Sequence, residues 1–238
     1  MKVYIYCLTE GTDALPNSLR GIAGAAVRWI DTGCFSSVVS DFAGEAVLVN
    51  RENALAHAAV VQSVFKQTTP LPFRFGTLVT EPKLNSYLTA RRETLQRKLE
   101  QVRGCVEMSV KIVWNRNWTD ESLHKDVQEK PGTAFLHEKR RQLMGSEARA
   151  AEARRIAVWL EDKTGEMVRE KRIDTNPTEK LLLAAAYLVE RGAVEQYRVR
   201  LKEAREEKPE LHFLVSGPWP PYSFANIDLE FKSQFGVS

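Results

Sequence analysis

Histidines next to acidic residues are natural candidates for metal binding or acid-base chemistry. This chain has four histidines, and the pair His137-Glu138 begins like the zinc-protease motif. The fourth residue after His137 is Arg141, where that motif requires a second histidine on the same helix face. The other histidines, at positions 57, 124 and 212, lie on separate expected elements. The sequence therefore predicts no metal site.

Cysteines and glycine-rich turns are the other places where chemistry could reside. Cys7, Cys34 and Cys105 form no C-x-x-C pair, which predicts reduced thiols rather than a zinc or redox site. Gly21 and Gly24 lack the third glycine of a dinucleotide-binding turn. The sequence contains neither a G-x-x-x-x-G-K-[ST] phosphate loop nor a G-x-S-x-G nucleophile elbow. We therefore expect a protein that is not an enzyme and binds no cofactor.

The composition of the chain indicates a folded protein. Its 238 residues allow one large domain or two small ones, and 43% are hydrophobic while 27% are charged, as in ordinary globular proteins. No apolar run approaches the roughly 20 residues of a membrane-spanning helix. The first residues, which alternate from Val3 onward, do not resemble a signal peptide. We expect a cytoplasmic protein with no membrane partner.

The charge is divided unevenly along the chain. Residues 1–104 carry twelve Lys and Arg against nine Asp and Glu, whereas residues 105–238 carry 22 of each kind, so the net charge of +3 belongs to the first part. Charged residues are also sparser in the first part. The two parts are therefore expected to have different surfaces, the second more heavily solvated.

The first part reads as an α/β domain. Apolar residues on both faces of the segment around Ile5 predict a central strand. Asn50 is a plausible N-cap for the helix that follows it, and Gly104 ends the connecting helix. The expected strands are 3–8, 27–30, 37–42 and 73–79, with 45–50 as a possible addition, and the expected helices are 51–67 and 81–103.

The second part reads as a ferredoxin-like sandwich. The alternation over 106–114 is the clearest half-buried strand in the sequence. The segment 180–190 favours helix by the propensity of its leucines and alanines, but the order of elements requires a strand. With helices at 133–162 and 193–207 and strands at 168–173 and 211–216, the order is βαββαβ. The expected fold is α+β with two domains, 1–104 and 105–217, followed by a Pro/aromatic tail over 218–238.

Three segments have a distinctive order and spacing, the first after the helix over 51–67, the second at the head of the long helix and the third after the last strand. They are Pro70-Leu71-Pro72-Phe73-Arg74-Phe75-Gly76-Thr77, Gly132-Thr133-Ala134-Phe135-Leu136-His137-Glu138-Lys139-Arg140-Arg141 and Ser216-Gly217-Pro218-Trp219-Pro220-Pro221-Tyr222-Ser223-Phe224. Together they resemble the gas vesicle protein GvpF/GvpL family over nearly the whole chain.

The resemblance implies a non-enzymatic accessory protein of gas vesicle formation. Such a protein would be a minor vesicle component that binds the small hydrophobic shell protein GvpA, with other accessory proteins as further partners. The implied fold has an N-terminal domain of modified ferredoxin type and a ferredoxin-like C-terminal domain. The first segment (Leu71, Pro72, Phe73, Arg74, Phe75, Gly76, Thr77) is the candidate partner-binding motif. The structural motif positions are Gly132, Phe135, Leu136, Arg140, Arg141, Gly217, Pro218, Trp219, Pro220, Pro221 and Tyr222.

Two other binding functions are open. Ferredoxin-like sheets can stack RNA bases on aromatic residues, and Phe73-Arg74-Phe75-Gly76 faintly resembles an RNA-binding strand. Leu71-Pro72 replaces the basic-plus-glycine opening of that motif, and glutamates offset the basic cluster at 139–141, so no phosphate-binding stripe emerges. We therefore expect no nucleic-acid partner. Alternatively, the charged helix over 133–162 could serve as a hub for other accessory proteins.

The expected binding surface lies on the N-terminal domain, near the strand over 73–79. If that segment alternates as a strand, Phe73 and Phe75 share one sheet face. Their ordinary role would be burial in the core. A sparsely charged face on the first domain could bind the apolar shell protein. The densely charged second domain would keep the protein itself from precipitating. If the two phenylalanines are internal, the contact is expected at the edge of the same sheet.

Overall fold

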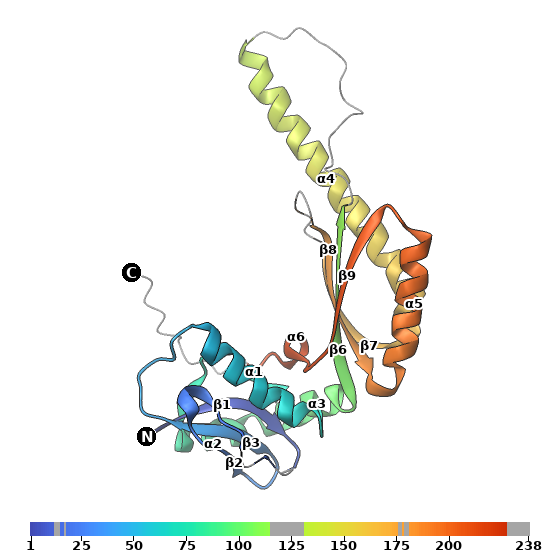
Figure 1. The fold of residues 1–238 in the computed structure, drawn as a ribbon. Helices are drawn as coiled ribbons and strands as arrows, with labels where there is room; N and C mark the ends of the chain where they lie inside the picture. The colour runs from blue at the N-terminus through green and yellow to red at the C-terminus, as the bar shows by residue number, and fades with distance from the viewer. Residues whose placement is uncertain (12–14, 17, 115–130, 176–177, 179–180, 228–238) are drawn as a thin grey trace. The chain divides into compact units, whose positions relative to one another are not determined.

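The computed structural model describes all residues except 12–14, 17, 115–130, 176–177, 179–180 and 228–238 (Figure 1). The chain forms two compact units with separate sheets, and the α+β, two-domain fold class expected from the sequence is confirmed. Unit 1 comprises Met1–Glu107 together with Trp219–Ser238, and unit 2 comprises Met108–Pro218. Within the described residues, no helix is long and apolar enough to cross a membrane.

The sheet of unit 1 is built around β1 (Lys2–Thr9), in which every residue from Val3 to Thr9 is buried. The antiparallel strand β3 (Ser36–Phe42) pairs with one edge of β1, and β2 (Val27–Asp31) pairs with β3. Two short strands, β4 (Leu71–Pro72) and β5 (Leu78–Thr80), pair with the other edge of β1. The prediction of a central first strand is confirmed, because a strand buried on both faces needs neighbours on both edges.

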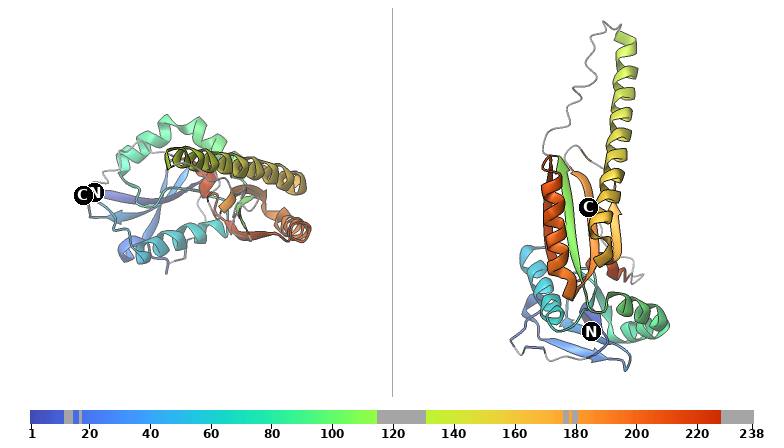
Figure 2. Two further views of the ribbon diagram at one scale, coloured as in Figure 1. Left: turned by 90° about the horizontal axis from the view of Figure 1, so that it is seen from above. Right: turned by 90° about the vertical axis from the view of Figure 1, so that its right-hand side faces the viewer.

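Helices cover both faces of this sheet (Figure 2). The helix α1 (Arg51–Phe65) lies on one face and begins as predicted at Asn50, whose side chain accepts a hydrogen bond of 2.8 Å from the Asn53 amide. The helices α2 (Glu81–Ala90) and α3 (Arg92–Val102) lie on the other face. A short 3₁₀ turn, η1 (Ile22–Gly24), precedes β2.

Three predictions for unit 1 were wrong. Residues 43–50 form no strand. The helix predicted over 81–103 is two helices, because the backbone leaves helical geometry at Arg91 (φ −112°, ψ 17°). The strand predicted over 73–79 is confined to the short β4 and β5 at its two ends, with a loop over residues 73–77 between them.

Unit 2 has the predicted βαββαβ order. Its elements are β6 (Cys105–Trp114), α4 (Pro131–Thr164), η2 (Gly165–Met167), β7 (Val168–Asp174), β8 (Leu181–Glu190), η3 (Arg191–Ala193), α5 (Val194–Glu207) and β9 (Leu211–Trp219). The sheet order β7-β8-β6-β9 is that of a ferredoxin-like sandwich. The strand expected over 180–190 is confirmed as β8, so topology overrides the helix propensity of its leucines and alanines.

The two helices of unit 2 pack on each other, and both contact β8, so they lie side by side on one face of the sheet. The longer helix, α4, has 34 residues and spans about 50 Å at 1.5 Å per residue. A ten-residue strand such as β8 spans only about 33 Å. The N-terminal part of α4 therefore extends past the end of this sheet (Figure 1).

The segment after β9 belongs to unit 1. It forms the short helix α6 (Tyr222–Ala225), with Phe224 and Ala225 buried. The Glu107 carboxylate accepts 2.7 Å hydrogen bonds from both the amide and the hydroxyl of Ser223. The Lys98 ammonium donates to the carbonyls of Ala225 and Asn226 at 2.9 and 3.0 Å. The core of unit 1 is thus completed by residues more than 110 positions away in sequence.

Candidate functional site

The first motif segment begins inside the sheet and then leaves it. Leu71, Pro72 and Phe73 are buried, and the Phe73 amide donates to the Tyr6 carbonyl at 2.9 Å. The chain then turns because the Thr77 hydroxyl and amide both donate to the Arg74 carbonyl, at 2.6 and 3.3 Å. Gly76 takes a left-handed backbone conformation (φ +86°) that favours glycine. This turn is the physical reason that the predicted strand is interrupted.

The hydroxyl of Tyr4 holds this loop against β1. It accepts a hydrogen bond from the Gly76 amide at 3.1 Å and lies 2.8 Å from Nδ1 of His57. Because the amide can only donate, we assign the tyrosine proton to the His57 contact, which places the histidine proton on Nε2. Phe75 is half-buried, with its ring centroid 5.9 Å from that of His57 and 6.3 Å from that of Tyr4.

The third motif segment reaches the same place. The ring centroid of Tyr222 lies 6.3 Å from that of His57, and Tyr6 lies 5.7 Å from the same imidazole. We refer to these rings as the aromatic cluster, comprising Tyr4, Tyr6, His57, Phe75 and Tyr222. The sequence did not predict it, because nothing in a single sequence shows that rings more than 140 positions apart share one contact.

His57 is enclosed at the centre of the aromatic cluster. Its side chain is on the inner face of α1, only 4% of the residue is exposed, and burial lowers its pKa to about 4. It is therefore neutral at neutral pH. Its Nε2 has no hydrogen-bond partner among the described residues. A neutral imidazole held by a phenol and surrounded by rings acts as a packing element that fixes α1 and the 73–77 loop to β1.

The remaining motif positions are distributed over both units. Gly132, Phe135, Leu136, Arg140 and Arg141 lie in the first turns of α4, in unit 2. Gly217 and Pro218 lie near the end of β9 and are the last residues of unit 2, whereas Trp219, Pro220, Pro221 and Tyr222 belong to unit 1. The structure therefore brings parts of the first and third segments together in the aromatic cluster. Among the described residues, no group of three or more His, Cys, Asp or Glu side chains could hold a metal ion.

The outer face of α1 is an exposed apolar surface that the sequence analysis missed. From Asn53 to Phe65 the helix contains no Asp, Glu, Lys or Arg, although four of these thirteen residues are exposed. Leu55 is 58% exposed, and Leu48 and Val49, just before the helix, are 75% and 78% exposed. The Leu48 carbonyl accepts from the Asn53 side chain at 3.0 Å, which joins this loop to the helix. We call this the α1 surface: Leu48, Val49, Ala54, Leu55, Ala58 and Ala59.

A solvent-facing helix surface ordinarily carries charges, so this one is unusual. The thirteen residues from 53 to 65 contain no Asp, Glu, Lys or Arg, and this run could have indicated the α1 surface. The same run is equally consistent with a buried helix. Only the burial of His57, Val60, Val61 and Val64 on the inner face shows which residues remain outside.

Comparison with known proteins shows which family the chain belongs to. Residues 2–226 match the family model described as gas vesicle synthesis protein GvpL/GvpF. The chain belongs to this family. It is 30% identical to gas vesicle protein L of Streptomyces sp. (strain CB03234), across 94% of this chain and 92% of that protein. It is 25% identical to gas vesicle protein F1 of Halobacterium salinarum, across 99% and 98% of the two chains.

Solved structures share the fold. The crystal structure of the gas vesicle protein GvpF from Anabaena sp. PCC7120 superposes with a TM-score of 0.77 at 21% identity, covering 95% of this chain and 97% of that one. The crystal structure of GvpF from Microcystis aeruginosa gives a TM-score of 0.73 at 19% identity, with coverage of 95% and 99%. The resemblance found from the three motif segments is confirmed, and membership of this family implies a role in gas vesicle assembly.

Proposed function

We propose that this protein is a non-enzymatic assembly factor that binds the small hydrophobic gas vesicle shell protein, GvpA. It would cover the apolar surface of GvpA until the subunit joins the growing vesicle, and would remain a minor component associated with the vesicle. The observation that carries the proposal is the α1 surface, an exposed and uncharged helix face on the unit with the lower charge density.

The physical problem for such a partner is premature aggregation. A small, apolar, strand-rich subunit self-associates through open sheet edges and apolar faces unless these are covered. An uncharged helix face can cover apolar surface without leaving a charge desolvated in the contact. The heavily charged unit 2 would then keep the complex in solution.

The α1 surface fits this role better than the segment first expected to carry it. Phe73 is 1% exposed and lies in the core, so it is not accessible to a partner. The second expected location was the edge of the same sheet, and the edge formed by β2 carries Arg28, which pairs with Asp41 at 2.9 Å and also with Glu81. Charges at a strand edge oppose pairing with another strand. We propose instead that the 70–77 segment supports α1 from behind through the aromatic cluster.

The test places a charge on the α1 surface in the full-length chain. Leu55→Lys and Ala58→Lys should leave the melting temperature unchanged, because both positions are exposed, and should weaken GvpA binding about tenfold through desolvation of the added charge. Val158→Lys and Val199→Lys, at exposed apolar positions of unit 2 (68% and 55%), are the matched controls and should bind as wild type. Light scattering of GvpA with each variant would report protection from aggregation.

The second candidate function is a hub that binds other accessory proteins through α4. The length of this helix beyond its own sheet favours the hub. Undiminished GvpA binding by the α1 variants, together with binding lost when charges on α4 are reversed, would support the hub and contradict our proposal. The RNA-binding alternative loses its basis, because Phe73-Arg74-Phe75-Gly76 does not form a strand and Phe73 is buried.

A further inference from the structure

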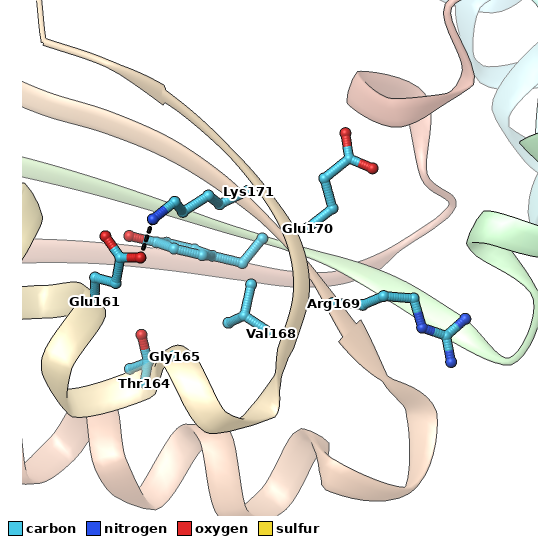
Figure 3. A pocket seen from close by; sticks show the side chains of 8 residues that line it. Glu161, Thr164, Gly165, Val168, Arg169, Glu170 and Lys171 are labelled. Carbon is cyan, nitrogen blue, oxygen red and sulfur yellow. Dashed lines mark ion pairs between the residues drawn. The ribbon is translucent and has the colours of Figure 1, made fainter.

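A pocket of about 320 Å³ lies in unit 2, beside the C-terminal end of α4 (Figure 3). Its walls come from the last turn of α4, the η2 turn, the start of β7 and one residue of β8. They are Glu161, Thr164, Gly165, Val168, Arg169, Glu170, Lys171 and Tyr187. This volume is at the lower end of the range for small-molecule sites and is enough for a ring-sized group.

Tyr187, one of the residues that line the pocket, has an unused hydrogen-bonding group. The residue is 1% exposed, and its hydroxyl has no hydrogen-bond partner among the described residues. Burial, with a smaller contribution from the charge of Glu161, raises the pKa of this hydroxyl, so it stays protonated and can donate. An incoming acceptor would give this hydroxyl the hydrogen bond that it lacks.

The charged residues of the pocket offer no net attraction to an ion. Two are acidic and two are basic, and each is already paired: Glu161 with Lys171, Arg169 with Glu190 at 2.9 Å, and Glu170 with Arg172 at 3.9 Å. An ionic ligand would have to break one of these pairs. An uncharged ligand would leave all three pairs intact, so charge balance favours an uncharged occupant.

The pocket is also within reach from the edge of the sheet. Lys171 is the cross-strand neighbour of Tyr187. Its pairing with Glu161 links β7 to α4 (Figure 3). The side chains of this pair are 39% and 46% exposed, so the pair lies where solvent and a ligand can reach it. Four consecutive β7 residues line the pocket, and the register shifts between Val168 and Glu170, so the site reaches the outer edge of this terminal strand.

We propose that this pocket binds an uncharged group with an amide or carbonyl oxygen, which accepts a hydrogen bond from the Tyr187 hydroxyl. A free small-molecule amide and the asparagine or glutamine side chain of an extended partner segment share this chemistry. In the second case the segment would pair with the outer edge of β7 while its side chain enters the pocket.

The experiment uses the full-length, ¹⁵N-labelled protein and follows its amide signals. Benzamide is the small-molecule probe, and benzoate and benzylammonium are its charged counterparts. The segment probe is acetyl-Val-Thr-Gln-Thr-Val-amide, with leucine in place of glutamine as its control. We expect benzamide or the glutamine peptide to shift the signals of Thr164, Gly165 and Lys171, and the charged or leucine counterparts to bind more weakly.

Tyr187→Phe provides the decisive comparison. It should weaken binding of the active probe about fivefold, the equivalent of one hydrogen bond, and leave the melting temperature equal or slightly higher. Tyr197→Phe is the matched control, because the Tyr197 hydroxyl is also buried and unpaired but the residue does not line the pocket. It should bind the probe as wild type does.

Each remaining outcome is decisive. Shifts along the whole of β7 with the glutamine peptide would identify a partner segment, and binding of benzamide alone would identify a small molecule. No binding by either probe, equal binding by Tyr187→Phe, or loss of folding in Tyr187→Phe would overturn the proposal. In the last case the hydroxyl would be needed by the free protein.

Discussion

Four buried tyrosines divide equally between the two units and behave differently in each. In unit 1 the hydroxyls of Tyr4 and Tyr6 are hydrogen-bonded: Tyr4 to the Gly76 amide and His57, and Tyr6 to the Ser40 hydroxyl and the Ile22 amide, both at 2.8 Å. In unit 2 the hydroxyls of Tyr187 and Tyr197 have no partner among the described residues. All four side chains are at most 1% exposed.

The difference shows that burial alone does not define the role of a tyrosine. In unit 1 each hydroxyl reaches a backbone amide outside the regular strands and so determines where the 73–77 loop and the η1 turn lie. In unit 2 the rings of Tyr187 and Tyr197 pack against each other at 5.9 Å and contribute apolar surface. Removing a hydroxyl should therefore cost stability in unit 1 and almost none in unit 2.

The largest effect is expected from Gly21→Ala. An added Cβ would overlap the Tyr6 hydroxyl, which is held by Ser40 and by the Ile22 amide. Overpacking and the loss of these hydrogen bonds should together lower the free energy of unfolding by about 4 kcal/mol, measured by urea denaturation. Gly192→Ala, where a Cβ meets nothing within 4 Å, is the control and should be nearly neutral. Equal stability of the two variants would contradict the role given to Tyr6.

The next largest effect is the loss of stability that His57 causes at acidic pH. The unfolded chain protonates this histidine near pH 6.5, whereas the folded protein does so only near pH 4. Between these values the unfolded chain holds more protons, so the free energy of unfolding falls as pH drops from 6.5 to 4, by roughly 3 kcal/mol from this residue. His57→Leu should lose this part of the pH dependence in urea titrations. Parallel profiles for the two proteins would show that His57 is accessible.

A smaller loss is expected from Tyr4→Phe. The substitution keeps the ring but leaves the Gly76 amide and Nδ1 of His57 without their partner. We expect the free energy of unfolding to fall by about 2 kcal/mol. Hydrogen exchange at the Gly76 amide should accelerate at the same time, because its acceptor is gone. An unchanged exchange rate would mean that the loop is held by its turn alone.

The smallest effect is expected from Tyr197→Phe. Its hydroxyl has no partner to lose, so the melting temperature should stay within a degree or so of wild type, or rise slightly. If Tyr197→Phe lost as much stability as Tyr4→Phe, buried tyrosine hydroxyls would contribute equally in the two units, contrary to our expectation.

The sequence predicted the regular elements of the molecule well where the pattern is local. The alternation of β6 and the cap at Asn50 are examples, and β8 was found because the order of its neighbours outweighed its leucines and alanines. The break at Arg91 has neither glycine nor proline to mark it. The strand predicted over 73–79 is interrupted by the turn between Arg74 and Thr77, and the Tyr4 hydroxyl, more than 70 residues distant in sequence, holds that turn against β1. The aromatic cluster and the α1 surface likewise follow from three-dimensional packing, which one sequence does not specify.

The return of residues 219–227 to unit 1 bears on the order in which the protein matures during translation. Unit 2 is a continuous stretch, so all its residues have been synthesised before the ribosome reaches Trp219. Unit 1 is complete only when Ser223 can donate to Glu107 and Phe224 can fill the core, about 6–23 seconds after Glu107 is made. The usual N-terminal-first order is thereby reversed. The helix that we propose to bind an aggregation-prone partner becomes firmly supported only after all of unit 2 has been synthesised.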